Sequence, residues 1–323
     1  MFRPTKFEEF IGNEDIKERL RLYMSVCKKE KKTLPNVLFV GPAGTGKTTL
    51  ANIVAKEWGG ELFSITGGSL RTQDELMVLM RNIEKAQKKK DVFLMIDEIH
   101  ELPKATLPEA VWLPLMENYT MYYSVAGYAG TYATIKPHVV TLVMNPFTIM
   151  GATTNPEDLS KPLRDRFSIM CHMQEYNDTD MGMILAQCAK KEGIGISMEA
   201  LRDMVTRSRG NPRTGNAMFD LTVMRAKSKT EKIISLKTFR EEMKAQKVDN
   251  LGLSIRDREV LQILADNTKP MGASRVANML LIKPKALMEM HEYYLAKKGL
   301  ISIDNKGRTI TTLGKRHIRN HYF

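Results

Sequence analysis

The pattern of apolar and polar positions changes twice along the 323-residue chain. From Met1 to about Asp178, short continuous apolar runs alternate with segments of helical periodicity. The apolar runs are NVLFVG (36–41), DVFLMID (91–97) and FTIMGATT (147–154), and helices are expected over Lys47–Trp58 and Gln73–Gln87. Uninterrupted apolar strands are typical of a parallel sheet with both faces covered. We therefore expect an α/β domain over residues 1–178.

Helical periodicity alone continues from about Thr179 to Val248, and no further strand is indicated there. Amphipathic helices are expected over residues 181–193, 197–210 and 216–229. Gly193 and Gly210 stand where a glycine commonly ends a helix in a left-handed conformation. This pattern predicts a small all-helical domain over residues 179–250.

The last region, residues 251–323, has a third pattern. Three helical segments (256–267, 272–280 and 283–300) are followed by an alternating stretch, ISIDNKGRTITTLG (301–314). DNKG (Asp304–Gly307) supplies turn residues in the middle of that stretch. Three helices followed by a hairpin are typical of a winged helix-turn-helix.

Charge is concentrated in this last region. The chain has a net charge of +12, and residues 251–323 hold 13 Lys and Arg against 6 Asp and Glu, which is +7 of that total. A concentrated positive charge favours a nucleic-acid partner, although a generally basic, soluble surface is the alternative.

Other compositional features narrow the class of protein. Cys27, Cys171 and Cys188 have no paired spacing, which argues against a disulfide framework and against a zinc site. The histidines His100, His172 and His291 also lack ligand spacing and are expected to be structural. No signal peptide is recognisable, and no apolar stretch approaches the roughly 20 residues that span a bilayer. We expect a cytoplasmic protein with no membrane partner.

GPAGTGKT, residues 41–48, follows the first apolar run and opens the first expected helix. It matches G-x-x-x-x-G-K-[ST], in which glycines let backbone N–H groups face phosphate oxygens. Lys47 is expected to reach the β- and γ-phosphates of a nucleotide, and Thr48 to place its hydroxyl on Mg²⁺. A strand before the motif and a helix after it argue against a chance glycine-rich turn. The expected nucleotide contacts here are Gly41, Gly44, Thr45, Gly46, Lys47, Thr48 and Thr49.

Two adjacent carboxylates end the second apolar run. Asp97 is expected to hold Mg²⁺, the site's metal, through water, and Glu98 to polarise an attacking water. Their side chains should point apart, so that each can have its own role. The third run ends in GATTN (151–155), which places Thr153 or Thr154 near the γ-phosphate; Thr154 is our candidate for catalysis.

Two further segments carry arginines. PLRDRF (162–167) contains Arg164 and Arg166, and RGNPRTGN (209–216) places Arg213 near the start of a helix. Arg164 and Arg166 are either surface partners of Asp165, or one of them is an arginine finger that completes a neighbouring subunit's site.

The order of these motifs, followed by a winged helix, resembles the AAA+ superfamily and, more narrowly, the RuvB family of Holliday-junction branch-migration ATPases. The segments that resemble the family extend from RPTKFEEFIGNEDIKERL (3–20) to KGRTITTLG (306–314), so the resemblance covers nearly the whole chain. It implies a P-loop NTPase core, a small helical lid domain and a C-terminal winged-helix domain. Clamp-loader subunits share the ATPase motifs but lack this wing.

The resemblance also implies how the parts work. The protein is expected to form a homo-hexameric ring that binds ATP and Mg²⁺ between subunits and translocates double-stranded DNA at a four-way junction. Phe2 and Arg3 would lie at the adenine end, Tyr176 and Arg213 would close the site, and Arg166 would be the finger. In the wing, Lys306 and Arg308 are the expected DNA contacts, while Ile303 stands where the family has a second basic residue.

A hairpin over about residues 119–146 is longer than in the family, where this hairpin docks on the junction-binding partner RuvA. Its tip VAGYAGTYA (125–133) is apolar and aromatic, which suits a protein contact. The alternative is a hairpin folded onto its own ATPase core, and the partner is an ordinary RuvA, a divergent one or another protein. Glu101, where the family usually has Arg, also suggests a divergent member.

Three other functions compete with this one. A clamp-loader-like ATPase would bind a sliding clamp, and the winged domain argues against it. An ATP-switched transcription regulator would prefer one DNA sequence, whereas a motor that follows phosphates would bind any duplex with steep salt dependence. A small-molecule P-loop kinase would not need Glu98 or a basic third domain.

Overall fold

The computed structural model describes residues 2–104, 109–125 and 138–319. By its internal contacts the chain divides into two compact units. One unit is Arg3–Glu175, and the other comprises Phe2 together with the chain from Tyr176 onward.

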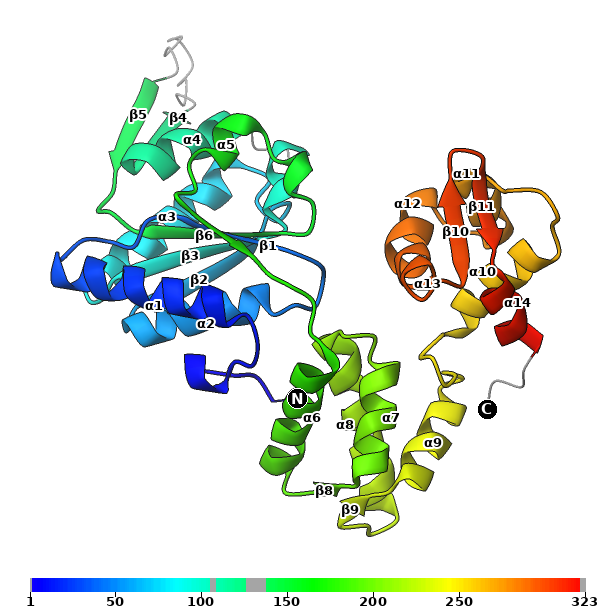
Figure 1. Cartoon of the computed structure of the whole chain (residues 1–323). Coiled ribbons are helices and arrows are strands. Elements are labelled where there is room, and N and C mark those ends of the chain that lie inside the picture. Colours follow the sequence, from blue (N-terminus) through cyan, green and yellow to red (C-terminus); the bar gives the residue numbers. More distant parts are fainter. Residues whose placement is uncertain (1, 105–108, 126–137, 320–323) are drawn as a thin grey trace, which may run out of the picture. The chain divides into compact units, whose positions relative to one another are not determined.

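The first unit is built around a parallel sheet of five strands (Figure 1). In spatial order they are β2 (Glu61–Thr66), β3 (Val92–Asp97), β6 (Thr148–Thr153), β1 (Val37–Val40) and β7 (Ile169–His172). Successive residues of β1 pack into different cores, Val37 and Phe39 into one and Leu38 and Val40 into the other. Both faces of the strand are thus buried, which explains its uninterrupted apolar sequence.

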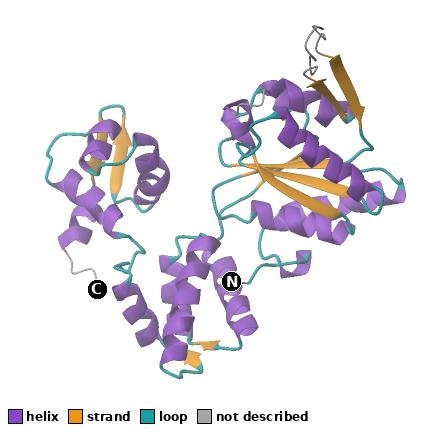
Figure 2. Cartoon of the chain, turned by 180° about the vertical axis from the view of Figure 1, so that it is seen from behind, coloured by secondary structure: helices purple, strands orange, loops and turns teal. Residues whose placement is uncertain are grey.

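Helices cover both faces of this sheet (Figures 1 and 2). The helices are α1 (Glu14–Lys29), α2 (Lys47–Trp58), α3 (Gln73–Gln87), α4 (Glu109–Asn118) and α5 (Lys161–Arg164), with 3-10 turns η1 (Phe7–Glu9), η2 (Ile99–Lys104) and η3 (Pro156–Asp158). Buried side chains of α1 and α2 belong to one core, and those of α3 and α4 to the other. The predicted helices Lys47–Trp58 and Gln73–Gln87 are confirmed at both ends. Thr72 and Glu75 form a capping box that fixes the start of α3.

An antiparallel hairpin extends from this unit. Its strands are β4 (Thr120–Val125) and β5 (His138–Val143), which confirms a hairpin within the predicted stretch 119–146. Residues 126–137, which include most of the tip that was expected to contact a partner, lie outside the described residues.

The second unit begins with a helical domain. Its elements are α6 (Asp178–Glu192), β8 (Gly195–Ile196), α7 (Met198–Arg207), α8 (Pro212–Ser228), β9 (Ile233–Ile234) and α9 (Leu236–Ala245). Gly193 ends α6 with φ 66°, as predicted. The prediction for Gly210 is wrong, because α7 already ends at Arg207 and the first left-handed residue after it is Arg209, with φ 59°.

Helix α8 begins four residues earlier than its apolar periodicity predicts, at Pro212 rather than at Asn216. The Asn211 side chain accepts a hydrogen bond from the backbone N–H of Arg213 at 2.9 Å and caps the helix. Proline is well tolerated in a first turn, so the helix can start there.

The winged-helix domain follows. Its elements are α10 (Ile255–Ala265), α11 (Ala273–Met279), α12 (Pro284–Leu287), the π-helical turn η4 (Met288–Glu292), α13 (Tyr293–Lys297), β10 (Ile301–Asp304), β11 (Gly307–Ile310) and α14 (Thr312–Arg319). β10 and β11 pair with Asp304 opposite Gly307, so DNKG forms the wing's turn as predicted. Together these elements confirm the predicted fold class, a P-loop core with a helical domain and a winged helix.

The end of the predicted hairpin is wrong, because residues 312–314 belong to α14 and not to a strand. The backbone N–H of Gly314 donates to Thr311 Oγ1 at 3.1 Å, which caps α14. A Cβ at Gly314 would lie 2.2 Å from Leu300 O, so a glycine lets the helix pack on the neighbouring backbone. Among the described helices, none is long and apolar enough to cross a membrane.

Candidate functional site

The glycine-rich loop connects the end of β1 to the start of α2. Gly44 and Gly46 have φ of 84° and 92°, a left-handed conformation that glycine adopts at little cost. At Gly41 a Cβ would lie 2.6 Å from the backbone oxygen of Met173, so no larger residue fits. The loop therefore curls as a phosphate-binding loop requires.

Lys47 lies inside this curl. Its Nζ donates to the backbone oxygens of Gly41 at 2.7 Å and Pro42 at 2.9 Å, and the side chain is buried. Thr45 is also buried and donates to Pro42 O at 2.9 Å. The ammonium group thus lies where the loop would surround phosphate oxygens. Thr49 is half-buried in the first turn of α2.

Thr48 and Asp97 are brought together although 49 positions separate them. Thr48 Oγ1 donates to Asp97 Oδ2 at 3.1 Å, and the second carboxylate oxygen, Oδ1, accepts from the N–H of Glu98 at 3.1 Å. A hydroxyl and a carboxylate in contact are oxygen donors of the kind that Mg²⁺ prefers.

The Glu98 carboxylate has neighbours other than those of Asp97. Its backbone is left-handed, with φ 48°. Its Oε2 lies 3.5 Å from Thr154 Oγ1 and 3.4 Å from His100 Nδ1. Thr153 is fully buried and instead contacts His100, with Oγ1 3.0 Å from Nδ1. Of the two threonines, Thr154 is therefore the one whose hydroxyl faces the Glu98 carboxylate, and His100 is a neighbour of both that sequence spacing alone does not reveal.

Arg166 is held against its own chain. Its guanidinium donates to Glu117 Oε2 at 2.7 Å, to Pro162 O at 2.8 Å and to Leu113 O at 3.3 Å. Its side chain remains 24% exposed and Glu117 is 65% exposed, so this ion pair lies at the surface. Exposed pairs of this kind are weak, typically below about 1 kcal/mol, and a stronger partner can replace Glu117. The role of Arg166 as a finger stays a prediction.

The remaining predicted nucleotide contacts are divided between the two units. Arg3 is exposed in the first unit, and Phe2, Tyr176 and Arg213 belong to the second. Phe2 packs on the helical core with the Lys191 ammonium 5.1 Å from its ring centroid, and Tyr176 is buried in that core. Arg213 is exposed in the first turn of α8. Their place at the nucleotide stays a prediction.

The wing presents its two predicted DNA contacts differently. Lys306 is exposed in the turn, where its backbone N–H donates to Asp304 Oδ1. Arg308 makes a two-pronged ion pair inside the domain, with Nε 2.8 Å from Glu292 Oε1 and Nη2 2.9 Å from Oε2. Ile303 lies opposite Arg308 on β10 and is 44% exposed. Contact with DNA stays a prediction for both basic residues, but Arg308 also holds β11 to η4.

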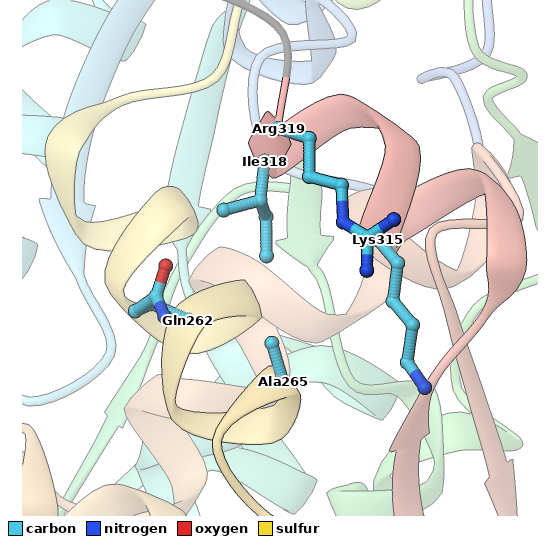
Figure 3. A pocket seen from close by; sticks show the side chains of 5 residues that line it. All are labelled: Gln262, Ala265, Lys315, Ile318 and Arg319. Carbon is cyan, nitrogen blue, oxygen red and sulfur yellow. The ribbon is translucent and has the colours of Figure 1, made fainter.

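A pocket of about 250 Å³ lies between α10 and α14 of the winged-helix domain (Figure 3). The lining residues are Gln262, Ala265, Lys315, Ile318 and Arg319. None of them is a residue that the motifs predict to act, so this pocket is separate from the candidate nucleotide site.

A second polar cluster lies where the helical domain joins the winged helix. Arg209 donates from Nε to Gly252 O at 2.9 Å and from Nη2 to Asp257 Oδ2 at 2.5 Å, and its guanidinium carbon lies 4.4 Å from the Tyr294 ring centroid. His291 Nδ1 is 2.7 Å from Asp257 Oδ1. We call Arg209, Gly252, Asp257, His291 and Tyr294 the joint. Its hydrogen bonds link residues 34 to 48 positions apart, and no local pattern indicates them.

The joint shifts the acidity of two of its members. Burial by itself would raise the pKa of Asp257, but the hydrogen bond with His291 and the positive charge of Arg209 outweigh burial, so this pKa is lowered. Burial raises the pKa of Tyr294 to about 12, against the opposing charge of Arg209. The joint therefore favours the ionised form of Asp257 and the protonated form of Tyr294.

Comparison with known families matches both ends of the chain. Residues 2–173 match the P-loop domain of the Holliday junction DNA helicase RuvB, and residues 250–319 match the RuvB C-terminal winged helix domain. The chain belongs to the RuvB family. The predicted resemblance is thereby confirmed.

Individual relatives extend the match to the whole length. The Holliday junction branch migration complex subunit RuvB of Lactobacillus gasseri is 34% identical over 311 residues, which cover 96% of this chain and 88% of the relative. That of Ligilactobacillus salivarius is 32% identical over 322 residues, covering 99% and 92%. Among solved structures, the RuvB Holliday junction branch migration motor of Thermotoga maritima is 28% identical, covers 99% of both chains and has a TM-score of 0.81.

Proposed function

We propose that this RuvB-family chain is an ATP-driven motor that moves double-stranded DNA during branch migration of Holliday junctions. The observation that carries the proposal is the arrangement at the end of β3, where Asp97 contacts Thr48 beside the phosphate-binding loop while Glu98 turns away toward Thr154. This arrangement separates a metal-holding carboxylate from one that can polarise water, as nucleotide hydrolysis requires.

The nucleotide is expected to be ATP with Mg²⁺. Thr48 would hold the metal directly and Asp97 would hold it through water, since their oxygens already lie within hydrogen-bonding distance of each other. Mg²⁺, when bound, supplies positive charge that offsets the charge developing on the phosphates. Lys47 would exchange its present contacts with loop carbonyls for phosphate oxygens. Phe2, Arg3, Tyr176 and Arg213 would surround the rest of the nucleotide.

The active assembly is proposed to be a homo-hexameric ring. The surface pair between Arg166 and Glu117 supports this, because an exposed ion pair is weak and Arg166 can exchange it, together with its two backbone contacts, for a neighbour's γ-phosphate. A mixture of Arg166→Ala and Lys47→Ala chains tests the arrangement between subunits. Each variant alone should be inactive, and the mixture should regain ATP hydrolysis. If mixed rings assemble but stay inactive, the arrangement between subunits is wrong.

DNA is proposed to contact the winged-helix domain through phosphates. Lys306 at the exposed wing turn is the foremost candidate, because Arg308 already uses two nitrogens to hold Glu292. A lysine that contacts phosphate gives no base readout, so this contact should be insensitive to sequence and should weaken as the salt concentration rises.

The hairpin of β4 and β5 is proposed to dock a RuvA-like junction-binding protein. Tyr122 and Val143, one on each strand, are 50% and 70% exposed. Within the described part of the chain, these two strands pair only with each other. An apolar, projecting hairpin suits a protein partner better than a phosphate backbone.

The deciding experiment is an ATP-dependent branch-migration assay on a synthetic four-way junction, with and without a RuvA-type protein. We expect migration that needs ATP, Mg²⁺ and the partner, and none with Lys47→Ala. Hydrolysis without migration, together with capture of a sliding clamp, would favour a clamp-loader-like ATPase. Strong preference for one duplex sequence would favour an ATP-switched transcription regulator.

A further inference from the structure

His100 is a buried imidazole beside the proposed catalytic carboxylate. It lies in η2, directly after β3, and is 5% exposed. Its Nδ1 is 3.0 Å from Thr153 Oγ1 and 3.4 Å from Glu98 Oε2, and its Nε2 is 3.3 Å from Glu101 Oε1. One ring therefore contacts the end of β6 and the two carboxylates that follow β3.

The chemistry of these partners determines how the ring can bond. A carboxylate only accepts hydrogen bonds, so the ring donates to Glu98 from an Nδ1–H and to Glu101 from an Nε2–H, and it can do both only when both nitrogens carry a proton. Nδ1 also faces the hydroxyl of Thr153. Thr153 is fully buried, and its hydroxyl oxygen also accepts the N–H of Asn155 at 3.0 Å. Glu101 thus fixes the ring from one side and Thr153 fixes it from the other.

The backbone around His100 is itself held in place. A Cβ at Gly67 would lie 2.4 Å from Glu98 O and 3.4 Å from Glu101 Cβ, so β2 packs directly on the turn. Ile99, which lies between Glu98 and His100 in the sequence, is fully buried in the hydrophobic core. This packing positions the backbone of Glu98 but not its carboxylate, which is 40% exposed and has rotatable bonds.

We infer that His100, anchored by Glu101, is a positioning residue that orients the Glu98 carboxylate for hydrolysis. Both described contacts of that carboxylate, from Thr154 at 3.5 Å and His100 at 3.4 Å, are to Oε2. Oε1 is then the oxygen directed at the attacking water. The inference rests on the proposed function of Glu98, and it links that residue to Thr153 and hence to β6.

The test compares single and double variants of the full chain. His100→Leu should lower kcat for ATP hydrolysis about 10- to 100-fold, because a misplacement of about 1 Å can cost that much. The Kd of ATP should stay within about 2-fold, since no contact with phosphate is lost. His100→Asn, whose amide can replace Nδ1 as a hydrogen-bonding group, should recover part of kcat. Glu101→Gln should have a smaller effect than His100→Leu.

A Glu98→Gln background separates positioning from general damage. If His100 acts through Glu98, His100→Leu should lower kcat no more than about 2-fold further in that background. His172→Leu, at an exposed histidine of the same unit, is the matched control and should leave kcat unchanged. Trp58 and Trp112 both lie in this unit, so tryptophan fluorescence checks its folding. If His100→Leu unfolds the unit, His100→Asn and Glu101→Gln are compared in both backgrounds instead.

Two results would overturn the inference. Equal losses of kcat in the wild-type and Glu98→Gln backgrounds would mean that His100 does not act through Glu98. A rise in the Kd of ATP that parallels the loss of kcat would indicate a structural role. Full turnover by Glu98→Gln alone would overturn both this inference and the proposed role of Glu98, so the two failures are distinguishable.

Discussion

The nucleotide site and the joint are both polar clusters, but they are built in opposite ways. At the nucleotide site Thr48 is exposed and Glu98 is 40% exposed, with contacts of 3.1 to 3.5 Å. In the joint, the side chains of Asp257 and Arg209 are 2% and 18% exposed, and they meet at 2.5 Å. The first cluster leaves its oxygens accessible to a ligand, whereas the members of the second satisfy one another.

The difference follows from the cost of burying charge. A buried carboxylate is tolerated only when cations and hydrogen-bond donors surround it, as Arg209, His291 and Ser254 surround Asp257. A carboxylate that must bind a metal or polarise water cannot be satisfied internally. Changes at the two clusters should therefore have opposite signatures, one in turnover and one in stability.

The largest expected effect on turnover is that of Glu98→Gln. Loss of the carboxylate that we propose to polarise water should lower kcat about 10²- to 10⁴-fold, because a positioned general base contributes that much. The free energy of unfolding of the first unit, measured by tryptophan fluorescence, should change by no more than about 0.5 kcal/mol, as is usual for partly exposed positions. A large loss of stability with little loss of turnover would break the comparison at this cluster.

Asp257→Asn should show the opposite signature. Removing the charge leaves Arg209 and His291 without their buried partner, which should lower the free energy of unfolding of the second unit by about 3 to 5 kcal/mol. The measurement is thermal unfolding by far-ultraviolet circular dichroism, compared with tryptophan fluorescence, which follows the first unit only. A parallel shift of both signals would contradict a local role. Glu289→Gln, on an exposed side chain of the same domain, is the control.

The wild type and Asp257→Asn should also differ in how their stability depends on pH in acid. The pKa of Asp257 is lowered in the folded chain, so its carboxylate stabilises the fold above its unfolded pKa of about 3.9. That contribution is lost as the pH falls from about 4 toward the lower folded pKa. Stability of the second unit should therefore decline less steeply below pH 4 in Asp257→Asn than in the wild type. Identical slopes would show that Asp257 carries no such shift.

The smallest expected effects concern the wing, which contains both an accessible basic residue, Lys306, and one that is paired within the protein, Arg308. Lys306→Ala should weaken DNA binding for every sequence and reduce the slope of log affinity against log salt by about 1, with no loss of stability. Arg308→Ala leaves the buried Glu292 carboxylate unpaired, which should destabilise the winged helix by about 1 to 3 kcal/mol. Filter binding over a salt series and thermal unfolding distinguish the two variants. Equal salt slopes with equal stability would remove this distinction.

Features that depend on neighbours in the sequence could be predicted. The glycine-rich loop, the adjacent carboxylates and helices α2 and α3 each result from residues within a few positions of one another. The two edge strands β2 and β7 have weaker apolar runs and were not predicted. Helix α14 was missed because Thr311 can continue a strand or cap a helix, and its contact with Gly314 decides between them.

Sequence alone therefore determined the order of a P-loop core, a helical region and a winged helix, and the identity of the phosphate-binding loop, since both depend on short-range periodicity and backbone geometry. Only the tertiary structure decided which polar residues remain accessible and which are satisfied within the protein. Arg308 was predicted from its position in the wing, but its bidentate contact with Glu292 arises from an element 16 positions away. His100 and Arg209 gained partners in the same manner. Such pairings depend on how strands and helices pack. Once a charged group is buried, the fold is stable only if that group has a hydrogen-bonding partner.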